Sequence, residues 1–203
     1  KKELGITLQL NPAQSDAYAN FGHIHFRKEH WNKAIEEFDH AIALGSNKPD
    51  TYYFAGLARS EKKAYGEAIP VLQKAVRLRS HKATYHFYLG NAFRHLGSFD
   101  EALQEFRRTL EIQPMHSQAQ NNIGVIFWNL KAYERAEVEF NKALDIQQNL
   151  PEIHQNLATL HLKNNRYANA IPHLDQVLKL QPGNTTAQKL LDHALGQMKK
   201  GPS

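Results

Sequence analysis

The sequence contains no cysteine. This absence excludes a disulfide framework, a cysteine-ligated zinc or iron–sulfur site and a thiol nucleophile as sources of stability or activity. Long hydrophobic runs are missing as well, because the longest apolar stretch, 123–128, contains Gly124 and falls far short of the ~20 residues that a membrane-spanning helix needs. The sequence therefore shows no transmembrane segment, and we expect a soluble protein of the cytoplasm or the periplasm.

Neither sign of charge dominates the chain. Its 25 Lys and Arg residues exceed its 20 Asp and Glu residues by only 5, and 41% of the 203 residues are hydrophobic. This composition is typical of a folded globular protein and excludes disordered and low-complexity fibrous classes. The basic residues cluster in one segment only, at Lys74, Arg77, Arg79 and Lys82. Nucleic-acid binding needs a continuous cationic track, so this local cluster disfavours a nucleic-acid partner.

Internal similarity is the strongest feature that the sequence does contain. Small residues return at intervals of 34 positions, at Gly22, Gly56, Gly90, Gly124 and Ala158, and alanines do so at Ala34, Ala68, Ala102, Ala136 and Ala170. Large apolar residues follow the same spacing at Phe38, Leu72, Phe106, Phe140 and Leu174. A period of about 20 to 50 residues is typical of solenoids, in which each repeat buries its hydrophobic face against its neighbours.

The pattern predicts two short antiparallel helices in each repeat. Apolar residues at three- and four-residue spacing, such as Ile35, Phe38 and Ile42, define the buried stripe of the second helix. The small residues allow the two helices to approach closely, and Pro70 and Pro172 fall early in a second helix, where a missing N–H costs least. In phase, the chain divides into the second half of a preceding helix at 1–14, five repeats at 15–48, 49–82, 83–116, 117–150 and 151–184, and a C-terminal capping helix with tail at 185–203.

These residues resemble the tetratricopeptide repeat (TPR) family, whose 34-residue pattern contains Trp, Leu-Gly, Tyr, Ala, Phe and a terminal Pro. The repeat 15–48 matches it best, with Tyr18, Phe21, Gly22, Ala34, Phe38 and Ala41, while Pro114 and Pro182 end later repeats. The tryptophan of the pattern is absent, and His86, Gln120 and His154 are among the residues in its place. The resemblance implies an all-α fold, a right-handed superhelical solenoid of helix-turn-helix repeats whose first helices line a concave face.

The repeat spacing predicts that the chain begins inside the second helix of a preceding repeat, because Leu4, Leu8 and Leu10 fall at apolar positions of that helix. Half a hairpin would expose its apolar stripe, so we expect the natural N-terminus to precede Lys1. Any signal peptide would lie there too, which leaves the compartment open.

Asparagines recur on the side of the first helices that turns away from the second helices. One position holds Asn20, Asn122 and Asn156, and Asn91 takes a neighbouring position in its own repeat. An amide both donates and accepts hydrogen bonds, so a row of amides can bind the backbone of an extended peptide. A similar asparagine ladder lines the superhelix of the O-linked N-acetylglucosamine transferases. The alternative is that these asparagines are solvated helix residues.

Aromatic residues interrupt this row. Phe54 and Tyr88 occupy the same position as the asparagines, and Trp128 lies near the end of another first helix. We expect these three residues to receive apolar side chains of a partner. Tyr53 and Phe87 directly precede Phe54 and Tyr88, and they either join this patch or pack between neighbouring helices.

Members of the family that bind the C-terminal carboxylate of Hsp70 or Hsp90 carry lysine, asparagine and arginine at fixed positions. In this chain those positions hold Ala19, His23, Phe54, Thr84 and Tyr88 in the first three repeats, and Phe87, Asn91, Asn122, Glu152 and Asn156 in the last three. Two asparagines match and every cation is absent. The resemblance therefore disfavours an Hsp70 or Hsp90 tail as the ligand.

Catalytic and metal-binding patterns are absent from the sequence. None of the 12 histidines lies three or four residues from another, the spacings that place two metal ligands on one helical face. His154 and His161 fall at packing positions, and we interpret them as hydrogen-bonded residues between helices. No phosphate-binding glycine loop, HExxH or GxSxG pattern occurs. We predict a chain that is not an enzyme and has no metal or cofactor.

The sequence favours a protein-interaction scaffold whose concave face binds an extended peptide or a helix of a partner protein. Two alternatives stay open: a substrate-recruiting or regulatory arm of a larger enzyme such as a glycosyltransferase, and a part of an envelope export or assembly machine. The identity of the partner and the oligomeric state stay open as well.

Overall fold

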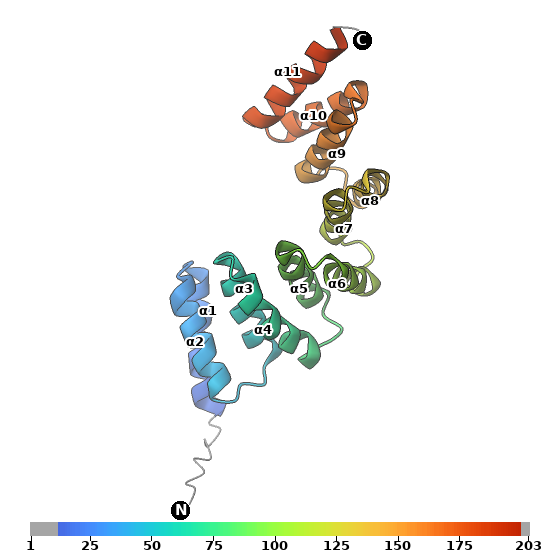
Figure 1. Cartoon of the computed structure of the whole chain (residues 1–203). Helices are drawn as coiled ribbons and strands as arrows, with labels where there is room; N and C mark the ends of the chain where they lie inside the picture. The colour runs from blue at the N-terminus through green and yellow to red at the C-terminus, as the bar shows by residue number, and fades with distance from the viewer. Residues whose placement is uncertain (1–11, 200–203) are drawn as a thin grey trace, which may run out of the picture. The chain divides into compact units, whose positions relative to one another are not determined.

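The computed structural model describes residues 12–199. Within them the regular secondary structure is entirely α-helical, which confirms the all-α prediction (Figure 1). The helices of this part are α1 (Pro12–Arg27), α2 (Trp31–Ala43), α3 (Pro49–Glu61), α4 (Tyr65–Leu78), α5 (Ala83–Leu96), α6 (Phe99–Ile112), α7 (Ser117–Asn129), α8 (Tyr133–Ile146), α9 (Pro151–Lys163), α10 (Tyr167–Leu180) and α11 (Thr185–Lys199). The fragment predicted at 1–14 lies outside the described residues up to residue 11, and residues 12–14 belong to α1.

Successive helices pair into hairpins. The helix α1 packs on α2, α3 on α4, α5 on α6, α7 on α8 and α9 on α10, and α11 lies against α10. Figure 1 shows the two helices of each hairpin side by side. The helices α3 and α9 begin at Pro49 and Pro151, whose fixed φ and missing N–H suit the first turn of a helix. Pro70 and Pro172 lie early in α4 and α10 and interrupt neither helix.

A glycine of the first helix interlocks with a large side chain of the second helix in four of these hairpins. A Cβ built on Gly22 would lie 2.6 Å from the ring of Phe38, and one built on Gly90 would lie 2.9 Å from the ring of Phe106. The equivalent pairs are Gly56 with Leu72 and Gly124 with Phe140. A side chain at the glycine would displace its buried partner, so the close approach predicted from the small residues is a steric requirement.

Each hairpin turns through one residue with a left-handed backbone. These residues recur at the repeat spacing, at Glu29 (φ 58°), Lys63 (φ 60°), Gly97 (φ 79°), Lys131 (φ 60°) and Asn165 (φ 56°). The next residue closes the turn by a backbone hydrogen bond, as Ala64 N does to Arg59 O at 2.9 Å. This is the Schellman arrangement, which favours glycine because other L residues are strained at positive φ.

The chain forms two compact units, Lys1–Ile112 and Gln113–Ser203, called here the first and second unit. In the first unit α2 packs on α3 and α4 packs on α5, so that the hairpins stack around buried residues such as Phe38, Leu72 and Leu89. In the second unit α8 contacts α9 and α10 contacts α11, with Leu174 and Val177 at the centre of the described core. Each unit is therefore a stack of helical repeats.

An arginine and a carboxylate join neighbouring hairpins in each unit. Arg59 of α3, whose side chain is only 10% exposed, binds both carboxylate oxygens of Asp39 of α2 at 2.7 and 2.8 Å. In the second unit Arg166, directly before α10, binds both oxygens of Glu137 of α8 at 3.3 and 2.6 Å. Bidentate pairs are directional, so they contribute to the register between hairpins as well as to stability.

Candidate peptide-binding surface

The residues predicted to bind a peptide are distributed over both units. The first unit carries Asn20 on α1, Phe54 on α3, and Tyr88 and Asn91 on α5, and the second unit carries Asn122 and Trp128 on α7 and Asn156 on α9. All of them stand on the first helix of a hairpin. Asn20 is exposed, and the other six side chains are half-buried.

Phe54 is enclosed by other aromatic rings. Its centroid lies 4.5 Å from that of His23, 5.2 Å from Phe26, 5.0 Å from Tyr53 and 6.4 Å from Phe38. These neighbours belong to α1, α2 and α3 itself. Much of the Phe54 ring therefore contributes to packing between hairpins, and only its remaining exposed part is left for a ligand.

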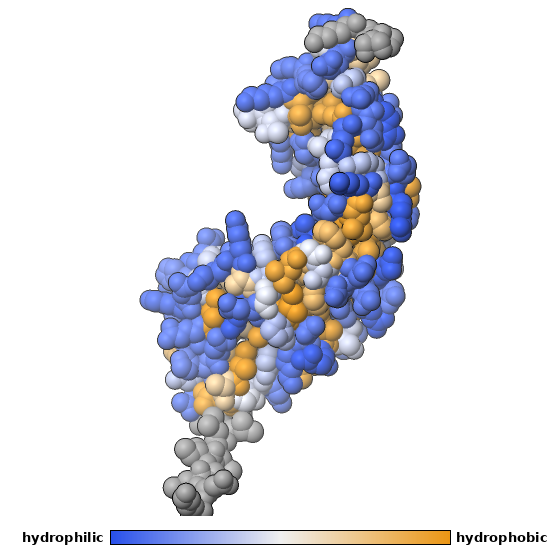
Figure 2. Space-filling model, viewed as in Figure 1, coloured by the Kyte–Doolittle hydropathy of each residue, from blue (hydrophilic) through white to orange (hydrophobic). Residues whose placement is uncertain are grey.

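Tyr88 lies on α5 at the edge of the same aromatic region. Its ring centroid is 5.6 Å from that of Tyr53 and 5.3 Å from that of Phe87. Tyr53 and Phe87 are each 9% exposed, so both pack between helices and do not join the exposed aromatic patch. Burial raises the pKa of the Tyr53 hydroxyl, and the neighbouring hydroxyls of Tyr88 and Tyr85 raise it further. Figure 2 shows hydrophobic residues reaching the surface over α5 between hydrophilic areas.

Asn20 borders a hollow of about 420 Å³ between α1 and the beginning of α3. Charges of both signs line this hollow, and Lys48 pairs with Asp16 at 2.7 Å. His23 lines it as well, and burial lowers the pKa of His23 although the charge of Asp50 opposes the shift. At neutral pH the hollow is therefore polar, with an uncharged imidazole and the Asn20 amide beside an ion pair.

Amide side chains of α7 and α9 contact each other in the second unit. Asn156 Nδ2 donates a hydrogen bond to Asn121 Oδ1 at 2.9 Å. Asn121 directly precedes Asn122, and Gln155 directly precedes Asn156, so each helix carries two adjacent half-buried amides. The repeat spacing predicted Asn122 and Asn156 in one row. In the structure the hydrogen bond between the two hairpins is formed by Asn156 and Asn121. Asn121 was not among the predicted residues.

Trp128 packs at the turn of its own hairpin. Its ring centroid lies 5.3 Å from that of Tyr133, in an edge-on arrangement. The Tyr133 ring is also contacted by a cation, because Lys163 Nζ lies 5.4 Å from its centroid. The half-buried indole therefore packs against the turn, and its remaining exposed surface is accessible to a ligand.

Arg94, near the C-terminal end of α5, is a residue that the sequence analysis missed. Its side chain is half-buried, its Nη2 lies 3.1 Å from Nε2 of His95, and its Nε is buried without a hydrogen-bond partner. The signal that could have found it is the repeat register. The equivalent positions hold Phe26, Ser60, Trp128 and Leu162, so Arg94 is the charged exception.

A family model described as Tetratricopeptide repeat matches residues 19–83, 64–114 and 89–151, and a second model of the same description matches residues 128–194. The chain belongs to the tetratricopeptide repeat family. The fold is therefore that of a TPR helical-repeat solenoid, and this TPR chain is a protein-interaction scaffold of a kind that is typically non-catalytic.

Solved TPR structures share the fold of this chain at low sequence identity. YrrB, described as a TPR protein with an unusual peptide-binding site, is 22% identical, with 85% of this chain and 89% of YrrB covered and a TM-score of 0.67. MamA from Desulfovibrio magneticus is 19% identical over 85% of this chain and 97% of that structure, with a TM-score of 0.75. PilF from Pseudomonas aeruginosa is 18% identical over 93% and 91%, with a TM-score of 0.74. No curated protein matches the sequence.

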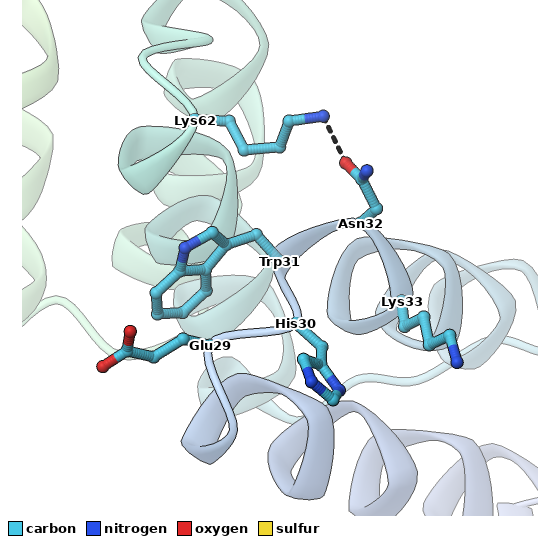
Figure 3. A pocket seen from close by; sticks show the side chains of 6 residues that line it. All are labelled: Glu29, His30, Trp31, Asn32, Lys33 and Lys62. Atoms are coloured by element: carbon cyan, nitrogen blue, oxygen red, sulfur yellow. Dashed lines mark hydrogen bonds between the residues drawn. The ribbon is translucent and has the colours of Figure 1, made fainter.

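Two further hollows mark the surface of this TPR protein. Figure 3 shows the first, at the turn between α1 and α2, where the indole of Trp31 lies beside Glu29 and below the chain of Lys62. Lys62 donates a hydrogen bond to Asn32 Oδ1 across it, and Phe26 packs edge-on against Trp31 at 5.1 Å between centroids. The second hollow lies in the second unit.

That second hollow is bordered by histidines between α9 and α10. His154 Nδ1 lies 3.0 Å from His173 Nδ1, which confirms His154 as a hydrogen-bonded interhelical residue. His161 stacks on His173 at 5.6 Å, but its Nδ1 is buried without a hydrogen bond, 4.0 Å from the Glu137 carboxylate. Within residues 12–199, no three His, Asp or Glu side chains are grouped as metal ligands.

None of the helices within residues 12–199 is both long enough and apolar enough to cross a membrane.

Proposed function

We propose that this TPR protein binds an extended peptide segment of a partner protein along its first helices. Its role as an interaction scaffold follows from its family, whereas the peptide mode of binding is the proposal. The residues involved are those predicted from the repeat register: Asn20, Phe54, Tyr88 and Asn91 in the first unit, and Asn122, Trp128 and Asn156 in the second.

The hydrogen bond between Asn156 and Asn121 is the observation that carries this proposal. It brings amide side chains of two hairpins within reach of each other. Asn156 uses its Nδ2 as the donor in this bond, and an amide still has a carbonyl oxygen to offer to a backbone N–H. Since successive amides stand one hairpin apart, they can hold a peptide that crosses the hairpins, and main-chain bonds make such binding tolerant of sequence.

The aromatic residues Tyr88, Tyr53 and Phe87 of the first unit support the same function. The half-exposed ring of Tyr88 packs on the buried Tyr53 and Phe87, so that the ring is held in place before a ligand arrives. A rigid aromatic residue with a polar end is typical of binding hot spots. The peptide-binding site in the description of YrrB supports this mode by analogy of fold alone.

The test begins with peptides selected on the wild-type chain from a random display library. The affinity of a selected peptide is measured by fluorescence anisotropy for the wild type and for the double variant Asn122→Ala/Asn156→Ala. Loss of two hydrogen-bonding amides should weaken binding by about 1 to 3 kcal/mol. Thermal melting should change little, because neither side chain fills the core.

Asn141→Ala is the matched control, since Asn141 is an exposed amide on α8, the second helix of the same hairpin as Asn122. It should leave the affinity unchanged. Equal affinity of the double variant and this control would reject the amide row as the binding element. Failure to select any peptide from the library would reject the peptide mode itself.

A further inference from the structure

The arginines of the hairpins differ in their counter-ions. Arg59 binds Asp39 and Arg166 binds Glu137, each through both carboxylate oxygens. Arg94 on α5 forms no ion pair with a carboxylate of the described residues, and no carboxylate contributes to its pKa. Arg59 and Arg166 thus have an acidic partner from another hairpin, and the half-buried Arg94 has none among the described residues.

The guanidinium of Arg94 is partly withdrawn from water. Burial lowers the pKa of Arg94, and the hydroxyl of Tyr65 opposes this shift. Its Nε is buried and bonds to no acceptor of residues 12–199. An arginine nevertheless stays protonated at any physiological pH. A cation without a carboxylate partner among the described residues therefore remains in a partly desolvated site.

His95 and Tyr65 hold this guanidinium in position. The two rings are parallel, with 4.5 Å between their centroids and 5° between their planes. Burial and the adjacent charge of Arg94 lower the pKa of His95. His95 is then neutral at pH 7, and its Nε2 accepts the hydrogen bond from Arg94 Nη2 at 3.1 Å.

A desolvated cation without an anion is unfavourable, and an arriving oxyanion would replace the water that the guanidinium has lost. The planar fork of arginine binds a carboxylate through two parallel hydrogen bonds. Asn91 lies three residues before Arg94 on α5 and Tyr88 three residues before Asn91, so each is a neighbour of the next on the helix surface. A peptide that contacts those two residues is therefore led towards the guanidinium.

We propose that Arg94 anchors the carboxylate of an acidic side chain of the peptide partner. The proposal rests on the proposed function and adds that the partner is acidic at this point. Charge complementarity supports it, because the cation has no acidic neighbour in the described structure. The site differs from the Hsp70 and Hsp90 carboxylate clamp, whose positions hold no lysine or arginine in this chain.

A direct readout is the Nε–H resonance of Arg94 in a ¹⁵N–¹H spectrum of the wild-type chain, assigned by its loss in Arg94→Lys. The probes are capped tri-glutamate, tri-glutamine and tri-phosphoserine peptides at low salt. Tri-glutamate should shift this resonance, and tri-glutamine should not. A response to tri-phosphoserine alone would make phosphate the ligand and overturn the proposal. No response to any probe would overturn it as well.

Variants then measure the contribution of the charge. Arg94→Gln should weaken the binding of tri-glutamate about 10- to 100-fold, as expected for a lost charge-assisted hydrogen-bonded pair. The control is Arg107→Gln, which removes the same charge from an exposed site on α6 of the same unit. Equal binding by the two variants would reject the anchor. If Arg94→Gln fails to fold, the titration of the wild-type chain still decides.

A cation near the end of α5 also stabilises the helix dipole. Arg94→Lys separates this role from the anchor, because lysine keeps the charge and loses the planar fork. It should melt like the wild type and bind tri-glutamate more weakly. Full binding by Arg94→Lys would reduce the residue to a helix-end charge. The Asn122 and Asn156 test lies in the second unit, so the peptide mode can hold while this anchor fails.

Discussion

In the first unit His86 of α5 contacts Glu105 of α6, with 2.6 Å between Nδ1 and Oε2, whereas in the second unit His154 of α9 contacts His173 of α10. In both cases the other ring nitrogen meets a backbone carbonyl oxygen of the preceding turn, at 2.9 and 2.8 Å. The repeat register is the same, and the side-chain partner changes from a carboxylate to an imidazole. This change of partner gives the two equivalent histidine pairs opposite responses to protons.

The carboxylate partner favours the charged form of His86. Burial alone would lower the pKa of His86, but the hydrogen bonds to Glu105 and to a backbone carbonyl, with the charge of Glu105, raise the pKa above its usual 6.5. The folded chain therefore binds a proton at His86 more tightly than the unfolded chain does. The stability from this pair is fully present below pH 6.5 and is lost as the pH rises through the folded pKa.

The imidazole partner has the opposite effect in the second unit. Burial, reinforced by the charges of His154 and His161 and opposed by Glu137, lowers the pKa of His173 to about 4. Burial also lowers the pKa of His161, with Glu137 opposing and Arg166 reinforcing the shift. The folded unit holds these rings neutral, so its stability falls as the pH drops from 6.5 through about 4.

The largest expected effect is that acid unfolds the second unit before the first. After an allowance for partial solvent exposure, the His173 shift corresponds to a loss of about 2 kcal/mol between neutral and acidic pH. Trp31 lies in the first unit and Trp128 in the second, so Trp31→Phe and Trp128→Phe leave one fluorescent reporter in each. Their acid transitions should separate, with Trp128 responding at the higher pH. Coincident transitions would contradict the comparison.

An exchange of the partners should exchange the responses. His173→Glu gives His154 a carboxylate and should stabilise the second unit at pH 5 by about 1 kcal/mol, while Glu105→His should destabilise the first unit by a similar amount. Urea unfolding at pH 5 and pH 8, followed through the tryptophan of each unit, measures both. Lys179→Gln, an equal charge change at an exposed site on α10, is the control. If it shifts stability as much as His173→Glu, net charge explains the effect.

The smallest expected change in stability concerns a turn position at which the two units have the same backbone conformation. Lys63 in the first unit and Lys131 in the second have the same left-handed backbone, with φ of 60°. Replacement of either lysine by glycine relieves this strain and should stabilise its unit by about 0.5 kcal/mol in urea unfolding. Gly97→Ala should destabilise the first unit in turn. A loss of stability in both glycine variants would show that the lysine side chains contribute contacts that outweigh the strain.

The repeat pattern predicted the hairpins and their closest contacts correctly. The pairing of Gly22 with Phe38 follows from sterics at a helix crossing, which act on single positions and therefore return with the period. The left-handed turns were not predicted, because only Gly97 and, more weakly, Asn165 are residue types that signal positive φ, whereas Glu29, Lys63 and Lys131 are not. Lys63 and Lys131 adopt the same backbone because the packed hairpin determines where the chain must turn.

The candidate site was predicted less completely than the fold. The register placed Phe54 and Asn156 on first helices, but it could not show that Phe54 is enclosed by His23 and Phe26 or that Asn156 donates to Asn121. These contacts join different hairpins. They depend on side-chain conformation and on stacking, neither of which repeats with the sequence.

The sequence by itself determined the repeated hairpin, since a small residue, a large residue and an apolar stripe at fixed spacing act locally and recur. Only the tertiary structure decided which polar side chains have partners: Arg59 meets Asp39 from another hairpin, and Arg94 meets no carboxylate of the described chain. The physical reason is that burial and ion pairing depend on groups distant in sequence. Their separation is set by how the hairpins stack and not by the period of the repeat.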